Sequence, residues 1–235
     1  MKIKAVLFDL DGTLLPMDQE VFTKAYFGAL SKKLAPYGYE PKPFIDAVWK
    51  GTVAMIKNDG AQTNEQVFWR TFAATLGDRV LGDKKYFDDF YNSEFNGLKA
   101  ASGFNEKAGA VVKEFKARGY KIIVATNPVF PRTAQENRLK FAGVDLDGVD
   151  YITSYENSHF CKPNPEYYAE ILRETGFCAD ECLMVGNDVD EDMVAEKLGL
   201  RVFLLSDCMI NRNGKDISRY ARGGFDELVA FMDKI

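Results

Sequence analysis

The second half of the chain alternates short apolar runs with amphipathic segments, and this alternation restricts the possible fold more than any other feature. The apolar runs are expected to be strands at 121–125, 151–153, 182–185 and 201–205. The amphipathic segments are expected to be helices at 107–118, 134–141 and 165–174, in a segment ending at Leu198, and at 225–232. Strand and helix units of this length need crossover connections between parallel strands. The sequence therefore predicts an α/β fold, with a parallel sheet covered by helices on both faces.

A further buried strand is expected at Val6–Phe8, and it ends at a pair of acids, Asp9 and Asp11, followed by Gly12. Side chains two residues apart on a strand face the same way, so both carboxylates can converge on one point beyond the sheet. Two like charges held this close indicate a bound divalent cation, a shared proton or a role in proton transfer. The end of this strand is therefore a candidate functional site.

Residues 16–98 interrupt this pattern with a helical insertion. No convincing strand is found there, and apolar residues recur at helical spacing in segments separated by turn clusters at 36–43, 58–64 and 77–83. We therefore expect residues 1–15 and 99–235 to form the core and residues 16–98 to form a helical cap. The cap would lie above the carboxyl ends of the strands, where open parallel sheets bind ligands.

Polar side chains also follow the other strands. Thr126 and Asn127 come after the strand at 121–125, Asn187 and Asp188 come after the strand at 182–185, and Lys162 lies in a proline-containing loop before a helix. Together with Asp9 and Asp11 this set suits phosphoryl transfer, because it offers a carboxylate nucleophile, an adjacent acid or base, and donors for phosphate oxygens. A phosphate dianion can approach these carboxylates only beside cations, which calls for Lys162 and a hard ion such as Mg2+.

Four motifs in this set resemble the haloacid dehalogenase (HAD) superfamily of aspartate-nucleophile phosphohydrolases. They occur in the order and at the separations typical of that family, and they are Asp9–Thr13, Thr126 with Asn127, Lys162 with Pro163, and Gly186–Asp192. The resemblance implies a Rossmann-like, three-layer parallel-sheet core with an α-helical cap inserted after the first strand. It also implies a Mg2+-dependent phosphatase that acts through an aspartyl phosphate.

The resemblance assigns the catalytic roles position by position. Asp9 would attack phosphorus, and Asp11 would protonate the leaving oxygen and then deprotonate the attacking water. Thr126 and the backbone amide of Asn127 would hold the transferring phosphoryl group. Lys162 would offset the negative charge on Asp9 and the phosphate.

The same resemblance implies the magnesium site. Asp9, the backbone carbonyl of Asp11 and Asp188 would bind the ion, and Asp192 would orient Lys162 or a metal-bound water. Many relatives have an acid directly after the glycine where this chain has Asn187, so Asn187 is an alternative oxygen donor to Asp188.

Several alternatives to this function stay open. The substrate is expected to be a small phosphorylated metabolite, and the carboxylate at Asp11 favours phosphate esters over halide displacement. A phosphosugar mutase on the same scaffold would return the phosphoryl group to the sugar, and a regulatory module would bind phosphate without turnover. The sequence does not indicate the substrate's identity or the oligomeric state.

Composition excludes other classes of function. A formal net charge of −5 argues against broad nucleic-acid binding. No apolar stretch approaches the length of a membrane span and no secretory signal is recognised, so a cytoplasmic protein is expected.

The single histidine and the cysteines are not expected to take part in catalysis. His159 is expected to be structural or exposed. The cysteines are expected to be free thiols, buried or half-buried, with a metal site at Cys178 and Cys182 as the alternative.

Overall fold

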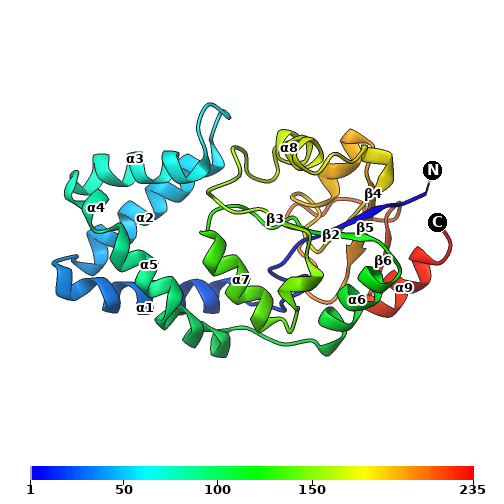
Figure 1. Ribbon diagram of the computed structural model, residues 1–235, viewed down its shortest axis with the longest axis horizontal. Helices are drawn as coiled ribbons and strands as arrows, with labels where there is room; N and C mark the ends of the chain where they lie inside the picture. The colour runs from blue at the N-terminus through cyan, green and yellow to red at the C-terminus, as the bar shows by residue number, and fades with distance from the viewer. Residues whose placement is uncertain (1) are drawn as a thin grey trace.

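The computed structural model describes residues 2–235 and contains a parallel six-stranded sheet in the order β3-β2-β1-β4-β5-β6 (Figure 1). Its strands are β1 (Ala5–Phe8), β2 (Lys121–Val124), β3 (Tyr151–Ile152), β4 (Cys182–Gly186), β5 (Arg201–Leu205) and β6 (Ala221–Gly223). Strand β1 is central, because Ala5–Phe8 pairs in parallel with β2 on one side and with β4 on the other. The α/β class predicted from the sequence is confirmed.

Helices cover both faces of the sheet, and alternate residues of each strand enter two separate apolar clusters. Val6 and Phe8 pack with the helices of one face, whereas Ala5 and Leu7 pack with those of the other. The first face is covered by α6 (Glu106–Ala117), α7 (Arg132–Phe141) and α9 (Phe225–Met232), and the second by α8 (Pro165–Thr175) and the 3-10 helix η5 (Met193–Leu198). Two short 3-10 turns, η3 (Leu146–Gly148) and η4 (Ala179–Glu181), complete the core. The sheet is therefore the middle layer of three.

Two elements of the core differ from the sequence prediction. The helix expected to end at Leu198 is a six-residue 3-10 helix. Strand β6 was not predicted, because its three residues are Ala-Arg-Gly and none of them is buried. Its side chains therefore give no apolar signal, and only its pairing with β5 identifies it as a strand.

The segment between β1 and α6 is entirely helical and lies beyond the carboxyl ends of the strands (Figure 1). Its elements are α1 (Gln19–Leu34), η1 (Ala35–Tyr37), α2 (Pro41–Ile56), α3 (Asn64–Leu76), α4 (Arg79–Gly82), α5 (Lys84–Asn92) and η2 (Glu94–Ala101). The Asp18 side chain caps α1, and Thr63 with Gln66 forms a capping box on α3. The predicted turn at 77–83 contains α4, and the expected boundary between residues 98 and 99 lies within η2.

Packing and hydrogen bonds join this helical segment to the core at two places. Phe95 packs against Phe141 of α7, and Asn137 of α7 donates a hydrogen bond of 2.8 Å to the carbonyl of Tyr91. On the other side, the backbone N–H of Asn64 donates to the carbonyl of Ser158, 2.8 Å away.

Candidate active site

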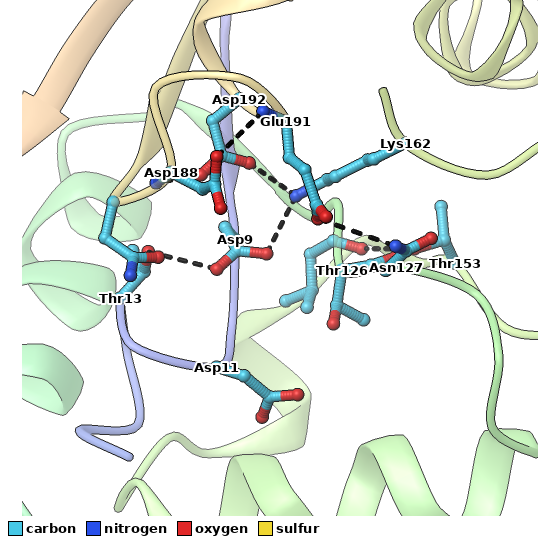
Figure 2. Close-up of polar contacts among 12 residues, drawn as sticks. Asp9, Asp11, Thr13, Thr126, Asn127, Thr153, Lys162, Asp188, Glu191 and Asp192 are labelled. Atoms are coloured by element: carbon cyan, nitrogen blue, oxygen red, sulfur yellow. Dashed lines mark hydrogen bonds and ion pairs between the residues drawn. The ribbon is translucent and has the colours of Figure 1, made fainter. Parts of the chain in front are cut away.

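A buried lysine lies between two carboxylates at the carboxyl end of β1 (Figure 2). The Lys162 Nζ atom donates to Asp9 Oδ1 at 2.7 Å and to Asp192 Oδ1 at 2.6 Å. The Thr13 hydroxyl donates to Asp9 Oδ2 at 3.1 Å, which fixes the other oxygen of that carboxylate. The structure thus brings together residues that lie 153 and 30 positions apart in the sequence.

Electrostatics keep this lysine charged. Burial alone lowers the pKa of the Lys162 ammonium, but Asp192 and Asp9 outweigh it and hold that pKa well above its ordinary value. Burial raises the pKa of Asp192, and the Lys162 ammonium and the Asp188 N–H oppose that rise. The three side chains therefore form one charge-coupled group.

Close packing against a glycine positions Asp192. A Cβ atom placed on Gly186, the last residue of β4, would lie 2.2 Å from the Asp192 carboxyl carbon. The Asp192 Oδ2 atom also accepts the backbone N–H of Asp188 at 2.9 Å. Only a residue without a side chain leaves room for this carboxylate beside the strand.

Gly186→Ala is expected to lower both stability and activity. The added methyl group must displace the Asp192 carboxylate, which we expect to lower the unfolding free energy by about 1–3 kcal/mol. Turnover should fall by at least about tenfold, because Lys162 loses one of its two carboxylate partners. Thermal unfolding and phosphate release measure the two effects. Gly28→Ala is the matched control, because no atom lies near a Cβ at that site within α1 and a small stabilisation is expected. Wild-type stability and turnover in the Gly186 variant would contradict this packing role.

Asp11 points away from the Asp9 carboxylate (Figure 2) and is ion-paired with a residue that the sequence reading missed. The Arg138 guanidinium of α7 donates to Asp11 Oδ2 and is itself almost fully buried. Burial raises the pKa of Asp11; Arg138 opposes that rise and Asp9 adds to it. The sequence signal for Arg138 is its position four residues after the buried Ala134, on the apolar face of its helix.

The loop after β2 is held by hydroxyl groups from neighbouring segments. The Thr126 carbonyl accepts hydrogen bonds from the Thr153 hydroxyl at 2.6 Å and from the Tyr167 hydroxyl at 2.9 Å. Asn127 donates to Glu191 at 3.5 Å, and its amide oxygen is buried without a hydrogen-bond partner. No role was predicted for Thr153, Tyr167 and Glu191, because their contacts depend on which loops lie side by side in the folded protein.

Most of the residues picked out in the sequence border one cavity of about 280 Å3, here called the polar cavity. Its lining includes Asp9, Asp11, Thr126, Asn127, Asn187, Asp188, Glu191, Asp192 and Arg212. Lys162 lies behind Asp9 and Asp192, to which it is bonded. This cavity has the acids, amides and hydroxyls that a phosphate ester and a hard cation would need.

Comparison with known proteins identifies the family. The profile of the haloacid dehalogenase-like hydrolases matches residues 3–199, most of the chain and all four motifs. The chain belongs to this hydrolase family.

Its relatives are distant. The pyrophosphatase PpaX of Bacillus cereus (strain AH820) is 25% identical over 210 residues, which cover 88% of this hydrolase and 84% of the relative. Among solved structures, a HAD phosphatase from Thermococcus onnurineus aligns with a TM-score of 0.58 at 21% identity, over 98% of both chains. L-2-haloacid dehalogenase from Xanthobacter autotrophicus aligns with a TM-score of 0.51 at 17% identity, over 89% of this chain and 79% of the dehalogenase. Both structural matches support the fold of this HAD-like hydrolase.

Oxygen donors suited to a divalent cation are available in the hydrolase. Asp188 lies in the polar cavity, where its Oδ1 accepts the N–H groups of Asp190 and Glu191 and its Oδ2 accepts from the half-exposed Arg212 at 2.7 Å. Asn187 differs, because its amide nitrogen donates to the carbonyl of Cys208, and its oxygen lies 3.0 Å from the Thr13 hydroxyl, whose single proton it shares with Asp9. Both ends of the Asn187 amide are thus engaged within the protein.

No group of three or more histidine, cysteine or acidic side chains arranged to hold a metal is found within residues 2–235. The donor set expected from the family has two carboxylates, of Asp9 and Asp188, and the backbone carbonyl of Asp11. Such a short list of oxygens fits Mg2+, which keeps several of its waters when bound to proteins. These residues therefore fit the ion.

The remaining candidates take no part in this site. The four cysteines are free thiols: Cys161 and Cys182 are buried and Cys208 is half-buried, whereas Cys178 is exposed rather than buried or half-buried as expected. The His159 ring bonds to Glu170 of α8 at 2.6 Å.

None of the helices within residues 2–235 combines the length and apolar character that crossing a bilayer demands.

Proposed function

We propose that this HAD-like hydrolase is a Mg2+-dependent phosphatase that hydrolyses small phosphomonoesters through a phosphoryl group on Asp9. The observation that carries the proposal is the buried Lys162 ammonium, bonded to Asp9 and Asp192, two carboxylates that line the polar cavity. A buried cation beside an oriented carboxylate lets a phosphate dianion approach that carboxylate. The names of the relatives, a pyrophosphatase and a HAD phosphatase, support phosphate chemistry.

In the first step an Asp9 carboxylate oxygen forms a bond to phosphorus while the bond from phosphorus to the leaving oxygen breaks. The Asp11 carboxyl gives its proton to that oxygen, which leaves as an alcohol. The raised pKa of Asp11 supports this role, since it increases the protonated fraction of the acid near neutral pH. Lys162 and Thr13 fix the attacking carboxylate through its two oxygens.

In the second step a water molecule attacks the phosphorus of the Asp9 phosphate. Asp11, now a carboxylate, takes the proton from this water, and the bond between phosphorus and Asp9 breaks to release inorganic phosphate. Thr126, the backbone N–H of Asn127 and Lys162 would hold the phosphoryl oxygens through both steps. The hydrogen bond from the Thr153 hydroxyl to the Thr126 carbonyl holds the loop that carries Thr126 and Asn127, which supports this role.

The metal site completes the proposal. Asp9, Asp188 and the backbone carbonyl of Asp11 would hold Mg2+, and the bound ion would neutralise charge on the phosphate oxygens. Asp188 is preferred over Asn187, because its carboxylate carries the negative charge that a hard cation favours and one of its partners, Arg212, is half-exposed. Asp192 would position Lys162, to which it is bonded.

We also propose that residues 16–98 act as a cap over the Rossmann-like core of residues 1–15 and 99–235. Closure of these helices would exclude water from the polar cavity until the phosphoryl group on Asp9 must be hydrolysed, when a water molecule has to enter. The cytoplasmic location stays a prediction from the sequence.

Removing divalent metal is expected to abolish phosphate release. The purified protein is incubated with para-nitrophenyl phosphate and Mg2+, and inorganic phosphate is measured before and after addition of EDTA. We expect turnover to fall to background with EDTA and to return when Mg2+ is added in excess, because the carboxylates otherwise repel the substrate. Metal-independent turnover, or none at all with a panel of phosphate esters, would overturn the proposal. An isomerised phosphosugar in place of free phosphate would indicate the mutase.

A further inference from the structure

A second cavity of about 200 Å3 adjoins the polar cavity and is mostly aromatic. We call it the aromatic cavity, and its lining includes Phe22, Tyr26, Trp49, Phe68, Trp69 and Phe130. Protein interiors contain few voids larger than a water molecule. Packing of the helical segment alone does not account for a space of this size.

The two cavities meet at Asp11. Both are lined by Asp11 and by four further residues, Gln19, Trp49, Val129 and Phe130. The Asp11 carboxyl points away from Asp9 (Figure 2), and Arg138, its ion-pair partner, also lines the aromatic cavity. Asp11 therefore stands between the space that suits a phosphate and the aromatic space.

This placement determines what the aromatic cavity would receive. A general acid must lie within hydrogen-bond reach of the atom it protonates, so the leaving oxygen lies beside Asp11. With the phosphoryl group in the polar cavity, the carbon chain attached to that oxygen extends past Asp11 into the aromatic cavity. The leaving group is therefore the part of the substrate that the aromatic residues contact.

The charges around the aromatic cavity disfavour an anionic leaving group. The charged side chains in its lining are Asp11 and Arg138. The positive charge of Arg138 is already paired with Asp11, and both terminal nitrogens of its guanidinium are bonded, to Asp11 and to Gln135, which leaves only Nε without a partner. Arg212 lines only the polar cavity, where it bonds to Asp188. A second phosphate or a carboxylate in the aromatic cavity would lose its hydration without gaining a free cation.

We infer that the substrate is a phosphomonoester of an apolar alcohol, with an aromatic or branched aliphatic group of about one ring seated in the aromatic cavity. The inference rests on the phosphatase function proposed above and names its substrate class. The volume of the aromatic cavity, about 200 Å3, agrees with this substrate class, because an apolar cavity of about 150 Å3 in another protein accommodates benzene. Inorganic pyrophosphate, suggested by the name of the Bacillus relative, does not fit this class.

The test compares esters whose leaving alcohols have similar acidity. We expect kcat/KM for benzyl phosphate to exceed that for 2-hydroxyethyl phosphate by at least about 100-fold, because only the former buries an apolar ring. Phosphoglycolate and pyrophosphate are expected to be poorer still. Equal rates for benzyl and hydroxyethyl phosphate, or a preference for pyrophosphate, would overturn the inferred substrate class. Either result would still be consistent with the proposed phosphatase function.

A matched pair of variants on α2 links this preference to the aromatic cavity. Thr52 lines the cavity, so Thr52→Phe fills it and should reduce the ratio of the two rates at least about tenfold. Val53, the next residue, is exposed and outside the lining, so Val53→Phe should leave the ratio unchanged. An unchanged ratio in the Thr52 variant, with both variants folded, would contradict the assignment.

A binding measurement separates the cavity from the chemistry. Both tryptophans of the chain, Trp49 and Trp69, line the aromatic cavity, and only Trp49 also lines the polar cavity, so the Trp69 fluorescence of a Trp49→Phe variant reports on the occupant of the aromatic cavity. Benzylphosphonate, which cannot be hydrolysed, should change this fluorescence saturably, and methylphosphonate at the same concentration should not. If no ester is hydrolysed but this response is seen, the proposed chemistry fails and the apolar site stands. Absence of the response overturns the site itself.

Discussion

Asp9→Asn is expected to reduce phosphate release by at least about 10,000-fold, because an amide cannot form the bond to phosphorus that the carboxylate forms. The substitution preserves the size of the side chain, and Lys162 keeps its bond to Asp192. We therefore expect the folded structure to persist, with a change in melting temperature of only a few degrees.

The measurement combines steady-state phosphate release with a rapid-quench search for phosphorylated protein. Wild-type protein should carry phosphate on Asp9 during turnover, and the Asn variant should carry none. Asp233→Asn is the control, because Asp233 is a surface residue bonded to Arg118 and lies outside both cavities. Near-normal turnover in the Asp9 variant that still requires Mg2+ would reject Asp9 as the nucleophile.

Lys162→Met is expected to have the second largest effect, and it acts on stability as well as activity. Removing the ammonium leaves the buried Asp9 and Asp192 without the cation that they share. Breaking a buried ion pair from one side costs about 3–5 kcal/mol. For a chain of this size that corresponds to a fall in melting temperature of roughly 6–20 °C. Phosphate release should become undetectable.

A double variant separates the two consequences of this change. Lys162→Met combined with Asp192→Asn removes one of the unpaired charges, so part of the lost stability should return while activity stays absent. Lys4→Met tests an exposed ion pair, that of Lys4 with Glu181, and should leave the melting temperature close to that of the wild type. The assignment is wrong if Lys162→Met is as stable as the wild type.

The sequence predicted the sheet well where its strands are buried and apolar. Residues 201–205 and 225–232 have the expected bounds, and β1, β2 and β4 agree with the prediction to within one residue. Strand β6 was missed, because its residues are polar or small and its identity depends on pairing with β5. Local composition cannot reveal an element that only tertiary pairing defines.

The candidate site was predictable to the extent that its residues end strands. Asp9, Thr126 and Asp188 follow apolar runs, and the carboxyl ends of parallel strands meet at one edge of the sheet. Arg138 was not predicted, because it lies within a helix and its partner Asp11 is 127 residues away. The aromatic cavity was equally hidden, since aromatic residues at helical spacing ordinarily pack against one another.

The two bonds made by Lys162 have a consequence for the whole reaction cycle. In the proposed mechanism the Asp9 side chain would become an acyl phosphate, and its oxygen nearest the ammonium would lose most of its negative charge. Asp192 undergoes no such change and stays 2.6 Å from the same nitrogen. Asp192 would therefore hold the Lys162 ammonium in place while Asp9 is phosphorylated and then hydrolysed. The same cation could then stabilise negative charge in both steps.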